Sequence, residues 1–242
     1  MQRDFSPDHP ELMDAADASP ASLREQLRRL EQMNRWFGGH AAVRTMLRPL
    51  FLGRRGAPFR IADLATGFGD HPRRLADWAA WRGVDLKVFA VDRNAETLRL
   101  ARDATRAAGH AHTVFFVQAD VMRLPFKNGA VEASLCSLAF HHFSEEEGIQ
   151  FLRESRRIVR PNGLAIVIDL IRGHLAYAAV WLLTQIWMND PYTRHDGRLS
   201  VLRAFTPEEI RSLAAKAGWK EMTWRRLPWF RQAIVGKAER TS

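Results

Sequence analysis

The sequence predicts one α/β domain built around a seven-stranded, mostly parallel sheet with helices on both faces. Short apolar segments of strand length alternate with helical segments between residues 60 and 170. This alternation implies crossover connections between parallel strands. The length of 242 residues and the apolar content of 46% suit one packed domain with additions better than two domains.

Residues 1–56 are expected to form an N-terminal arm and a helical cap. Residues 1–20 are rich in Asp, Pro and Ala, which predicts a loose arm. From residue 22 to residue 52 the apolar side chains recur at helical spacing. Gly38 and Gly39 interrupt this run, so we expect two helices instead of one.

Residues 57–242 are expected to form the domain itself, which opens with regular strand–helix units. The expected strands are 60–65, 86–91, 113–118, 131–137 and 164–170, and the expected helices are 72–82, 95–108 and 145–159.

The segment 171–205 interrupts this pattern and is expected to be an insertion, with an apolar helix followed by a polar loop that ends near Arg203. Thr206 and Pro207 then open another helix, because a capping hydroxyl and a proline in the first turn mark a helix start. That helix is expected to end near Gly218, and two short strands at 220–225 and 230–235 complete the sheet.

Composition narrows the class of protein. The single cysteine, Cys136, rules out an internal disulfide and fits a reducing cytoplasm, and the first residues lack the apolar core of a signal peptide. The longest apolar stretch, 175–188, is too short to span a bilayer, although contact with a membrane surface or a lipophilic substrate stays open. The net charge of +9 is spread along the chain, so no nucleic-acid partner is expected. The oligomeric state is not predicted.

A glycine turn carries the first functional signal. The strand residues Arg60 to Leu64 run into Gly67 and Gly69 and then into a helix, and this context suits a nucleotide-type ligand at the carboxyl edge of a parallel sheet. Asp70 is expected to cap the helix. A dinucleotide site would have a third small residue three positions after Gly69, where this chain has Pro72, so NAD is disfavoured.

Acidic residues follow the next two strands. Asp92 ends the second expected strand and is placed to accept hydrogen bonds from two ribose hydroxyls, and Asp120 follows the third, where a carboxylate can accept from an adenine amino group. Each acid alone is better explained as a turn or cap residue. Together with Asp63, they place an acid at the end of each of three successive strands.

The order of these motifs resembles that of class I S-adenosylmethionine-dependent methyltransferases. Within that family, the segments 63–70 and 119–126 are most similar to the ubiquinone/menaquinone biosynthesis branch (methyltransferase types 11 and 25), and 33–40 resembles its N-terminal helix. The resemblance implies a Rossmann-like fold and S-adenosylmethionine as cofactor. It assigns the cofactor site to Asp63, Ala65, Thr66, Gly67, Gly69, Asp92, Arg93, Asp120, Val121 and Ser137. No metal site is expected.

The methyl acceptor is expected near two histidines. His141 and His142 directly follow the fourth strand, at the edge where the methyl group should point. Histidine is a suitable base for an acceptor hydroxyl because it titrates near neutrality. A packing role, or a place in the cofactor pocket, is the competing interpretation; as base, His142 is preferred. His195, in the polar segment 192–197 of the insertion, is a third candidate, with a solvent-exposed turn as the alternative.

The sequence therefore predicts an enzyme of secondary metabolism that transfers a methyl group to a small aromatic, phenolic or polyketide-like acceptor, by O- or C-methylation. A quinone-precursor C-methyltransferase is the alternative, although the segment 138–143 differs from the glycine–arginine–asparagine type found in those enzymes. An RNA or protein methyltransferase and a non-catalytic binding module of the same fold complete the alternatives.

Overall fold

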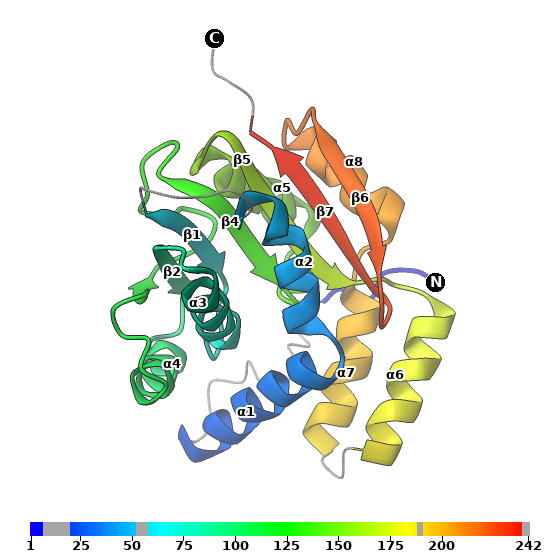
Figure 1. Cartoon of the computed structure of the whole chain (residues 1–242). Helices are drawn as coiled ribbons and strands as arrows, with labels where there is room; N and C mark the ends of the chain where they lie inside the picture. Colours follow the sequence, from blue (N-terminus) through cyan, green and yellow to red (C-terminus); the bar gives the residue numbers. More distant parts are fainter. Residues whose placement is uncertain (7–19, 52–57, 188–190, 239–242) are drawn as a thin grey trace.

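A seven-stranded sheet forms the centre of the computed structural model, which describes residues 1–6, 20–51, 58–187 and 191–238 (Figure 1). The strand order is β3-β2-β1-β4-β5-β7-β6. The strands are β1 Phe59–Leu64, β2 Leu86–Asp92, β3 Val114–Gln118, β4 Val131–Ser137, β5 Val159–Leu170, β6 Met222–Leu227 and β7 Arg231–Lys237. β1 to β5 pair in parallel and β7 runs antiparallel to both β5 and β6, which confirms the expected Rossmann-like, mostly parallel sheet.

Helices cover both faces of the sheet, as predicted. They are α1 Pro20–Trp36, α2 Gly39–Phe51, α3 Asp70–Arg82, α4 Ala95–Ala107, α5 Glu145–Arg157, α6 His174–Trp187, α7 Pro191–Arg203 and α8 Pro207–Lys216. The apolar sides of α2 and α3 pack on one face, and those of α5 and α8 pack on the other. β4, in the middle, is buried at six of its seven positions, because a central parallel strand faces helices on both sides.

The N-terminal cap consists of two helices that meet at Gly38 and Gly39, as expected. Gly38 has a φ of 71°, which allows the sharp turn between them. A Cβ on Gly39 would lie 2.4 Å from Oδ1 of Asn34, so only glycine lets the end of α1 approach α2 this closely. Most of the predicted loose arm (7–19) and of the segment that ends the cap (52–57) lie outside the described residues.

The polar part of the insertion is a helix, not the loop expected from the sequence. α7 begins with Pro191, whose fixed φ suits a first helical turn, and lies beside α6 (Figure 1). Gly197 is accommodated because it is the point of close contact: a Cβ there would lie 3.4 Å from Val180 and 3.5 Å from Thr184 on α6. Helix–helix packing thus overrides the low helix propensity of this polar, glycine-containing segment.

The junction between α5 and β5 also differs from the prediction. α5 ends at Arg157 instead of continuing to residue 159, and β5 begins at Val159 instead of residue 164. A register shift between β4 and β5 near Val131 accommodates the segment around Pro161, which is why the strand pattern was not visible in the sequence there.

Residues 1–6 connect segments that are far apart in the sequence. Arg3 donates from Nε to the carbonyl oxygen of Arg203 (2.7 Å) and from Nη2 to that of Phe143 (2.6 Å). Its guanidinium lies 3.8 Å from the centre of the Phe205 ring. The N-terminal segment therefore holds the end of α7 against the residues that follow β4.

Among the described residues, none of the helices has the length and apolar character needed to cross a membrane.

Candidate active site

The turn between β1 and α3 forms the floor of the candidate site. Ala65, Gly67 and Gly69 all have a positive φ, of 56°, 53° and 66°, so the backbone winds tightly between strand and helix. The residue preceding α3 is Gly69, with no side-chain cap. This corrects the expectation that Asp70 caps the helix: Asp70 is its first residue, and its carboxylate accepts hydrogen bonds from His40 and Asn34 instead.

Asp63 lies at the end of β1 and is 2% exposed. Oγ1 of Thr66 donates to Oδ2 of Asp63 at 2.5 Å. Burial raises the pKa of the Asp63 carboxyl to about 7, and the hydrogen bond from Thr66 only partly opposes this. The buried acid thus fixes the shape of the loop.

Asp92 connects the same loop to the end of β2. Its Oδ2 accepts a hydrogen bond from the backbone N–H of Gly67 (2.9 Å) and its Oδ1 accepts one from that of Asn94 (3.0 Å). Burial raises the pKa of this carboxyl, while the backbone hydrogen bonds oppose the rise. Each carboxylate oxygen has a second lone pair with which it can accept a ligand hydroxyl.

The end of the neighbouring strand lies alongside. Ala119 donates its backbone N–H to the carbonyl oxygen of Asp92 at 3.0 Å, which brings the segment holding Asp120 and Val121 next to β2. Asp120 is exposed and Val121 is buried, so one side of this wall is polar and the other apolar. Arg93, also exposed, lies beside Asp92 in sequence.

These residues fit the cofactor implied by the resemblance. A Cβ on Gly67 would meet no atom within 4 Å, so the glycine leaves open space at the loop. The first turn of α3 carries no side-chain cap, which leaves backbone N–H groups for an anionic group such as a carboxylate. Within the described part of the chain, Oγ of Ser137 at the end of β4 is buried without a hydrogen-bond partner. An unsatisfied buried hydroxyl at this edge is what a bound polar ligand would satisfy.

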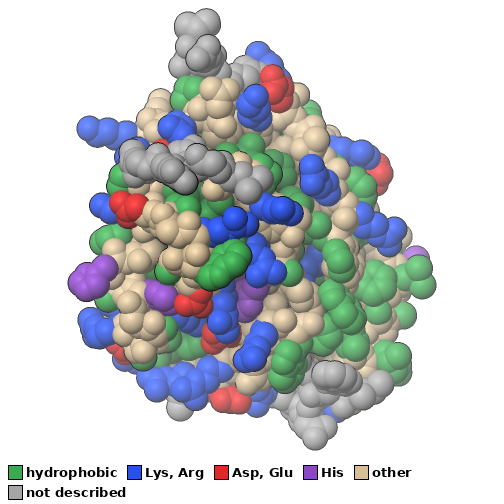
Figure 2. Space-filling view, in the orientation of Figure 1, with side chains coloured by type: hydrophobic (Ala, Val, Ile, Leu, Met, Phe, Trp, Pro, Cys, Tyr) green, Lys and Arg blue, Asp and Glu red, His purple; other side chains and the backbone are tan. Residues whose placement is uncertain are grey.

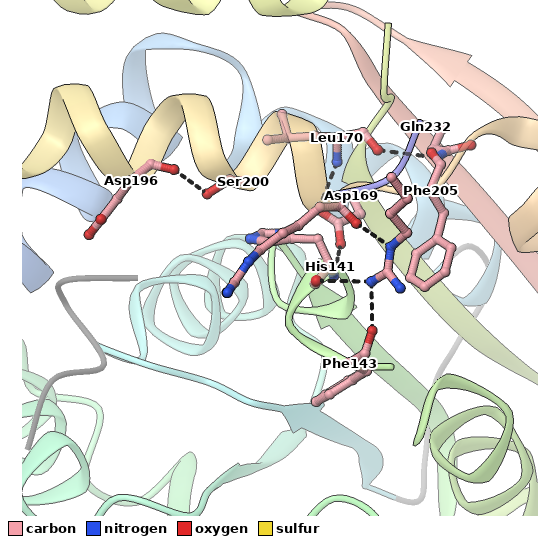
Figure 3. Close-up of polar contacts among 10 residues, drawn as sticks. His141, Phe143, Asp169, Leu170, Asp196, Ser200, Phe205 and Gln232 are labelled. Atoms are coloured by element: carbon pink, nitrogen blue, oxygen red, sulfur yellow. Dashed lines mark hydrogen bonds and ion pairs between the residues drawn. The ribbon is translucent and has the colours of Figure 1, made fainter. Parts of the chain in front are cut away.

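His141 is held by a carboxylate that the sequence analysis missed. Its Nδ1 lies 2.8 Å from Oδ1 of Asp169, and its backbone N–H donates to Oδ2 of the same residue at 2.7 Å (Figure 3). Both side chains are almost fully buried, with 4% and 3% exposed. An ionised carboxylate can only accept, so this hydrogen bond requires the proton on Nδ1 and leaves the lone pair of a neutral ring on Nε2.

The other two predicted histidines lie in different settings. The ring of His142 lies 4.4 Å from that of His141, centre to centre, and His142 is only half-buried. His195 lies on α7 with 52% of its side chain exposed, and its Nδ1 is 3.1 Å from Oδ1 of the adjacent Asp196. His141 thus has a buried carboxylate partner from a distant strand.

Asp169 had a signal in the sequence. It lies at the end of the apolar run of β5, as Asp63 and Asp92 lie at the ends of β1 and β2. An acid in this position lies at the carboxyl edge of a parallel sheet, so the same reasoning would have identified Asp169. The polar group formed by Asn34, His40, Asp70 and His71 had none, because residues from α1, α2 and α3 meet only in the fold.

Comparison with known proteins finds similarity to the family that the sequence resembles. Residues 61–163 match the family described as a methyltransferase domain. The chain is 33% identical over 141 residues to a demethylmenaquinone methyltransferase of Thermus thermophilus, covering 58% of this chain and 60% of the relative. It is 26% identical over 133 residues to a ubiquinone/menaquinone biosynthesis C-methyltransferase of Wigglesworthia glossinidia brevipalpis, covering 55% and 50%. The match thus spans little more than half of these relatives.

A solved structure shows the same fold over a larger part of the chain. The SAM-dependent methyltransferase of Aquifex aeolicus superposes with a TM-score of 0.61 at 16% identity, covering 88% of this chain and 97% of that one.

Proposed function

We propose that this chain transfers the methyl group of S-adenosylmethionine to a small aromatic, phenolic or polyketide-like acceptor. Its residues 61–163 match a methyltransferase domain, and its relatives include enzymes of the quinone-biosynthesis branch. The family and the fold support S-adenosylmethionine as the cofactor. It supplies a methyl group on a positively charged sulfur; the protein supplies orientation and proton handling.

The residues around the β1–α3 turn would hold the cofactor. Asp92 would accept the ribose hydroxyls, and the segment at Asp120 would border the adenine. The uncapped first turn of α3 would face the carboxylate end. These roles extend to Asp63, Ala65, Thr66, Gly67, Gly69, Arg93, Val121 and Ser137, which lie along the same strand ends and turns.

The hydrogen bond between His141 and Asp169 is the observation that carries the acceptor chemistry. The carboxylate fixes the ring orientation and leaves the basic lone pair on Nε2, as in other histidine–carboxylate pairs that act as bases. Such a base removes the proton of an acceptor hydroxyl, which makes the oxygen, or the ortho carbon of the same ring, a better nucleophile. His141 is therefore preferred over His142 and His195 as the base. The same geometry serves O- and C-methylation.

Quinone-precursor C-methylation is the second candidate, and the two curated relatives favour it by their names. An apolar surface on α6 also agrees with a lipophilic acceptor or a membrane contact. Leu175, Trp181 and Leu182 are 76%, 45% and 51% exposed, and Figure 2 shows apolar side chains gathered at this side of the molecule.

Cofactor binding by calorimetry tests the first half of the proposal. Replacing Asp92 with Ala removes the carboxylate proposed to accept hydrogen bonds from two ribose hydroxyls. At about 1.5 kcal/mol for each of these bonds, the lower end for charged partners, the Kd of the cofactor should rise about 100-fold. The matched control is Asp85→Ala, an exposed acid before β2, which should bind as the native chain does. Equal affinity in all three proteins would refute the assignment of Asp92.

Turnover of a panel of phenols, hydroxyquinones and quinols tests the second half. For the best acceptor, we expect His141→Ala and Asp169→Asn to lower kcat by about 100-fold or more, because general-base catalysis contributes 10²–10⁴-fold, with an unchanged Kd for the cofactor. His142→Ala and His195→Ala serve as matched controls. If these controls lose turnover and His141→Ala keeps it, the base has been assigned wrongly.

A further inference from the structure

A second polar cluster lies where the helical cap meets the start of α3. Asn34 comes from the end of α1, His40 from the start of α2, and Asp70 and His71 from the first turn of α3. Except for the half-buried His40, these residues are buried, with 5% to 8% exposed. The proposed cofactor site takes only backbone N–H groups from this turn of α3, and neither that site nor the proposed base uses the side chains of these residues.

The ligand atoms of three of these residues converge. Nε2 of His40 lies 2.7 Å from Oδ2 of Asp70, and the rings of His40 and His71 are 5.2 Å apart, centre to centre. One ligand atom from each of His40, Asp70 and His71 lies within 4.8 Å of the other two. Asn34 donates from Nδ2 to the same Asp70 oxygen at 3.1 Å, which orients the carboxylate.

The cluster contains polar atoms that the protein does not satisfy. Within the described part of the chain, both ring nitrogens of His71 and Oδ1 of Asn34 are buried without a hydrogen-bond partner. Buried polar atoms are nearly always hydrogen-bonded, and exceptions at a cluster of this kind point to a missing ion or ligand.

Two imidazoles and one carboxylate are a ligand set for a transition metal. Zn²⁺ and similar ions bind imidazole nitrogen and carboxylate oxygen at about 2.0–2.2 Å, which in a tetrahedral site puts neighbouring ligand atoms roughly 3.3–3.6 Å apart. The present separations, 2.7 Å and up to 4.8 Å, lie on both sides of that range. Movements of about 1 Å would therefore form the site.

The ligands available in the cluster favour a transition metal over Mg²⁺ or Ca²⁺. A groove of about 730 Å³ between α2 and α3 is lined by His40 and His71 and gives access from solvent. The same groove is lined by Arg44 and Arg74, and Figure 2 shows basic side chains and histidine close together over these helices. These arginines disfavour every divalent cation to the same extent, so the choice among ions depends on the ligands. Mg²⁺ and Ca²⁺ need several carboxylate oxygens, whereas Zn²⁺ or Co²⁺ gains affinity from the two imidazole nitrogens.

We propose that His40, Asp70 and His71 together bind one divalent transition-metal ion, such as Zn²⁺ or Co²⁺, at the junction of the helical cap and α3. This departs from the expectation that the chain has no metal site. The site does not depend on methyl transfer, because it is defined by residues outside the proposed cofactor and base positions.

Titration of the full chain, without a histidine tag and after treatment with a chelator, tests the proposal. With Co²⁺ we expect one ion per chain and a visible d–d absorption band; with Zn²⁺ we expect a rise in the thermal midpoint. His71→Leu should abolish these signals. Leucine fills a similar volume and removes both unsatisfied nitrogens, so this variant should fold at least as well as the native chain. His40→Gln, which keeps a hydrogen-bonding group beside Asp70, should weaken binding at least 10-fold.

His110→Gln is the matched control, because this histidine also has a carboxylate within 2.8 Å, that of Asp77, but lies outside the cluster. It should bind Co²⁺ as the native chain does. The proposal is overturned if the native chain binds neither ion at micromolar concentration, or if His71→Leu binds Co²⁺ as tightly as the native chain. Binding lost only in His110→Gln would also overturn it. All measurements are made without cofactor or acceptor, so failure here leaves the proposed methyl transfer untouched.

Discussion

Asp63 gives the most quantitative test of how the cofactor loop is built. The carboxyl is 2% exposed, and burial raises its pKa to about 7 from an ordinary value of 3.8. Between these two pH values the folded chain keeps a proton that the unfolded chain releases, so the free energy of unfolding must fall as the pH rises. The contribution is fully present below about pH 4 and is lost as the pH passes through about 7.

The size of the effect follows from the same shift. A difference of about 3 pKa units corresponds to about 4 kcal/mol, at 1.36 kcal/mol per unit. About two of those units lie between pH 5 and pH 7, so the loss over the range from pH 5 to pH 8 is about 3 kcal/mol. Asp63→Asn removes the titration and keeps an oxygen that accepts the hydrogen bond from Thr66.

Urea denaturation of the cofactor-free protein at several pH values measures this difference. The quantity to compare is the difference in the free energy of unfolding between Asp63→Asn and the native chain. Between pH 5 and pH 8 we expect this difference to shift by about 3 kcal/mol in favour of the variant, because only the native chain loses stability over that range. Asp85→Asn, an exposed acid, is the matched control and should follow the native chain. Parallel curves for Asp63→Asn and the native chain would show that Asp63 is ionised in the folded state and that burial does not govern its pKa.

Three further substitutions test other parts of the fold, each by urea denaturation. Ala65→Gly should stabilise the chain by about 0.5–1 kcal/mol, because Ala65 has a φ of 56° and the relief of strain exceeds the entropy that glycine adds to the unfolded chain; a loss of stability would contradict this. Gly236→Ala should destabilise by about 1–3 kcal/mol, because the new Cβ would lie 2.2 Å from the Trp219 ring; an unchanged midpoint would show that the ring moves freely. Arg172→Leu should cost about 1–3 kcal/mol, since Arg172 is buried and its loss removes the donor to the carbonyl oxygen of Ala204 and to Glu209; an unchanged midpoint would show that these hydrogen bonds are replaceable.

The strands of the sheet and the acids at their ends could be predicted from the sequence because both depend on residues that are close together in the chain. An apolar run of strand length followed by an acid places that acid at the carboxyl end of a parallel strand, and Asp63 and Asp92 lie there. The acceptor side depends on contacts across the fold. Asp169 and His141 are 28 residues apart and form a pair only because β4 and β5 are neighbours.

The insertion illustrates why the remaining structure could not be predicted. The segment 191–203 is polar and contains Gly197, which favours a loop when each residue is considered by itself. It is helical because α6 supplies a surface on which the glycine fits. The expected helix cap at Asp70 was wrong for a similar reason, since side chains from α1 and α2 occupy its carboxylate.

The N-terminal segment has a consequence for biosynthesis. Arg3 binds carbonyl oxygens of Phe143 and Arg203, yet Arg3 is translated about 140 and 200 residues before them. At about 5–20 residues per second, it waits roughly 10–40 s for its second partner. The edge that carries His141 therefore receives this N-terminal contact only after α7 has left the ribosome, although β1 to β4 are synthesised earlier.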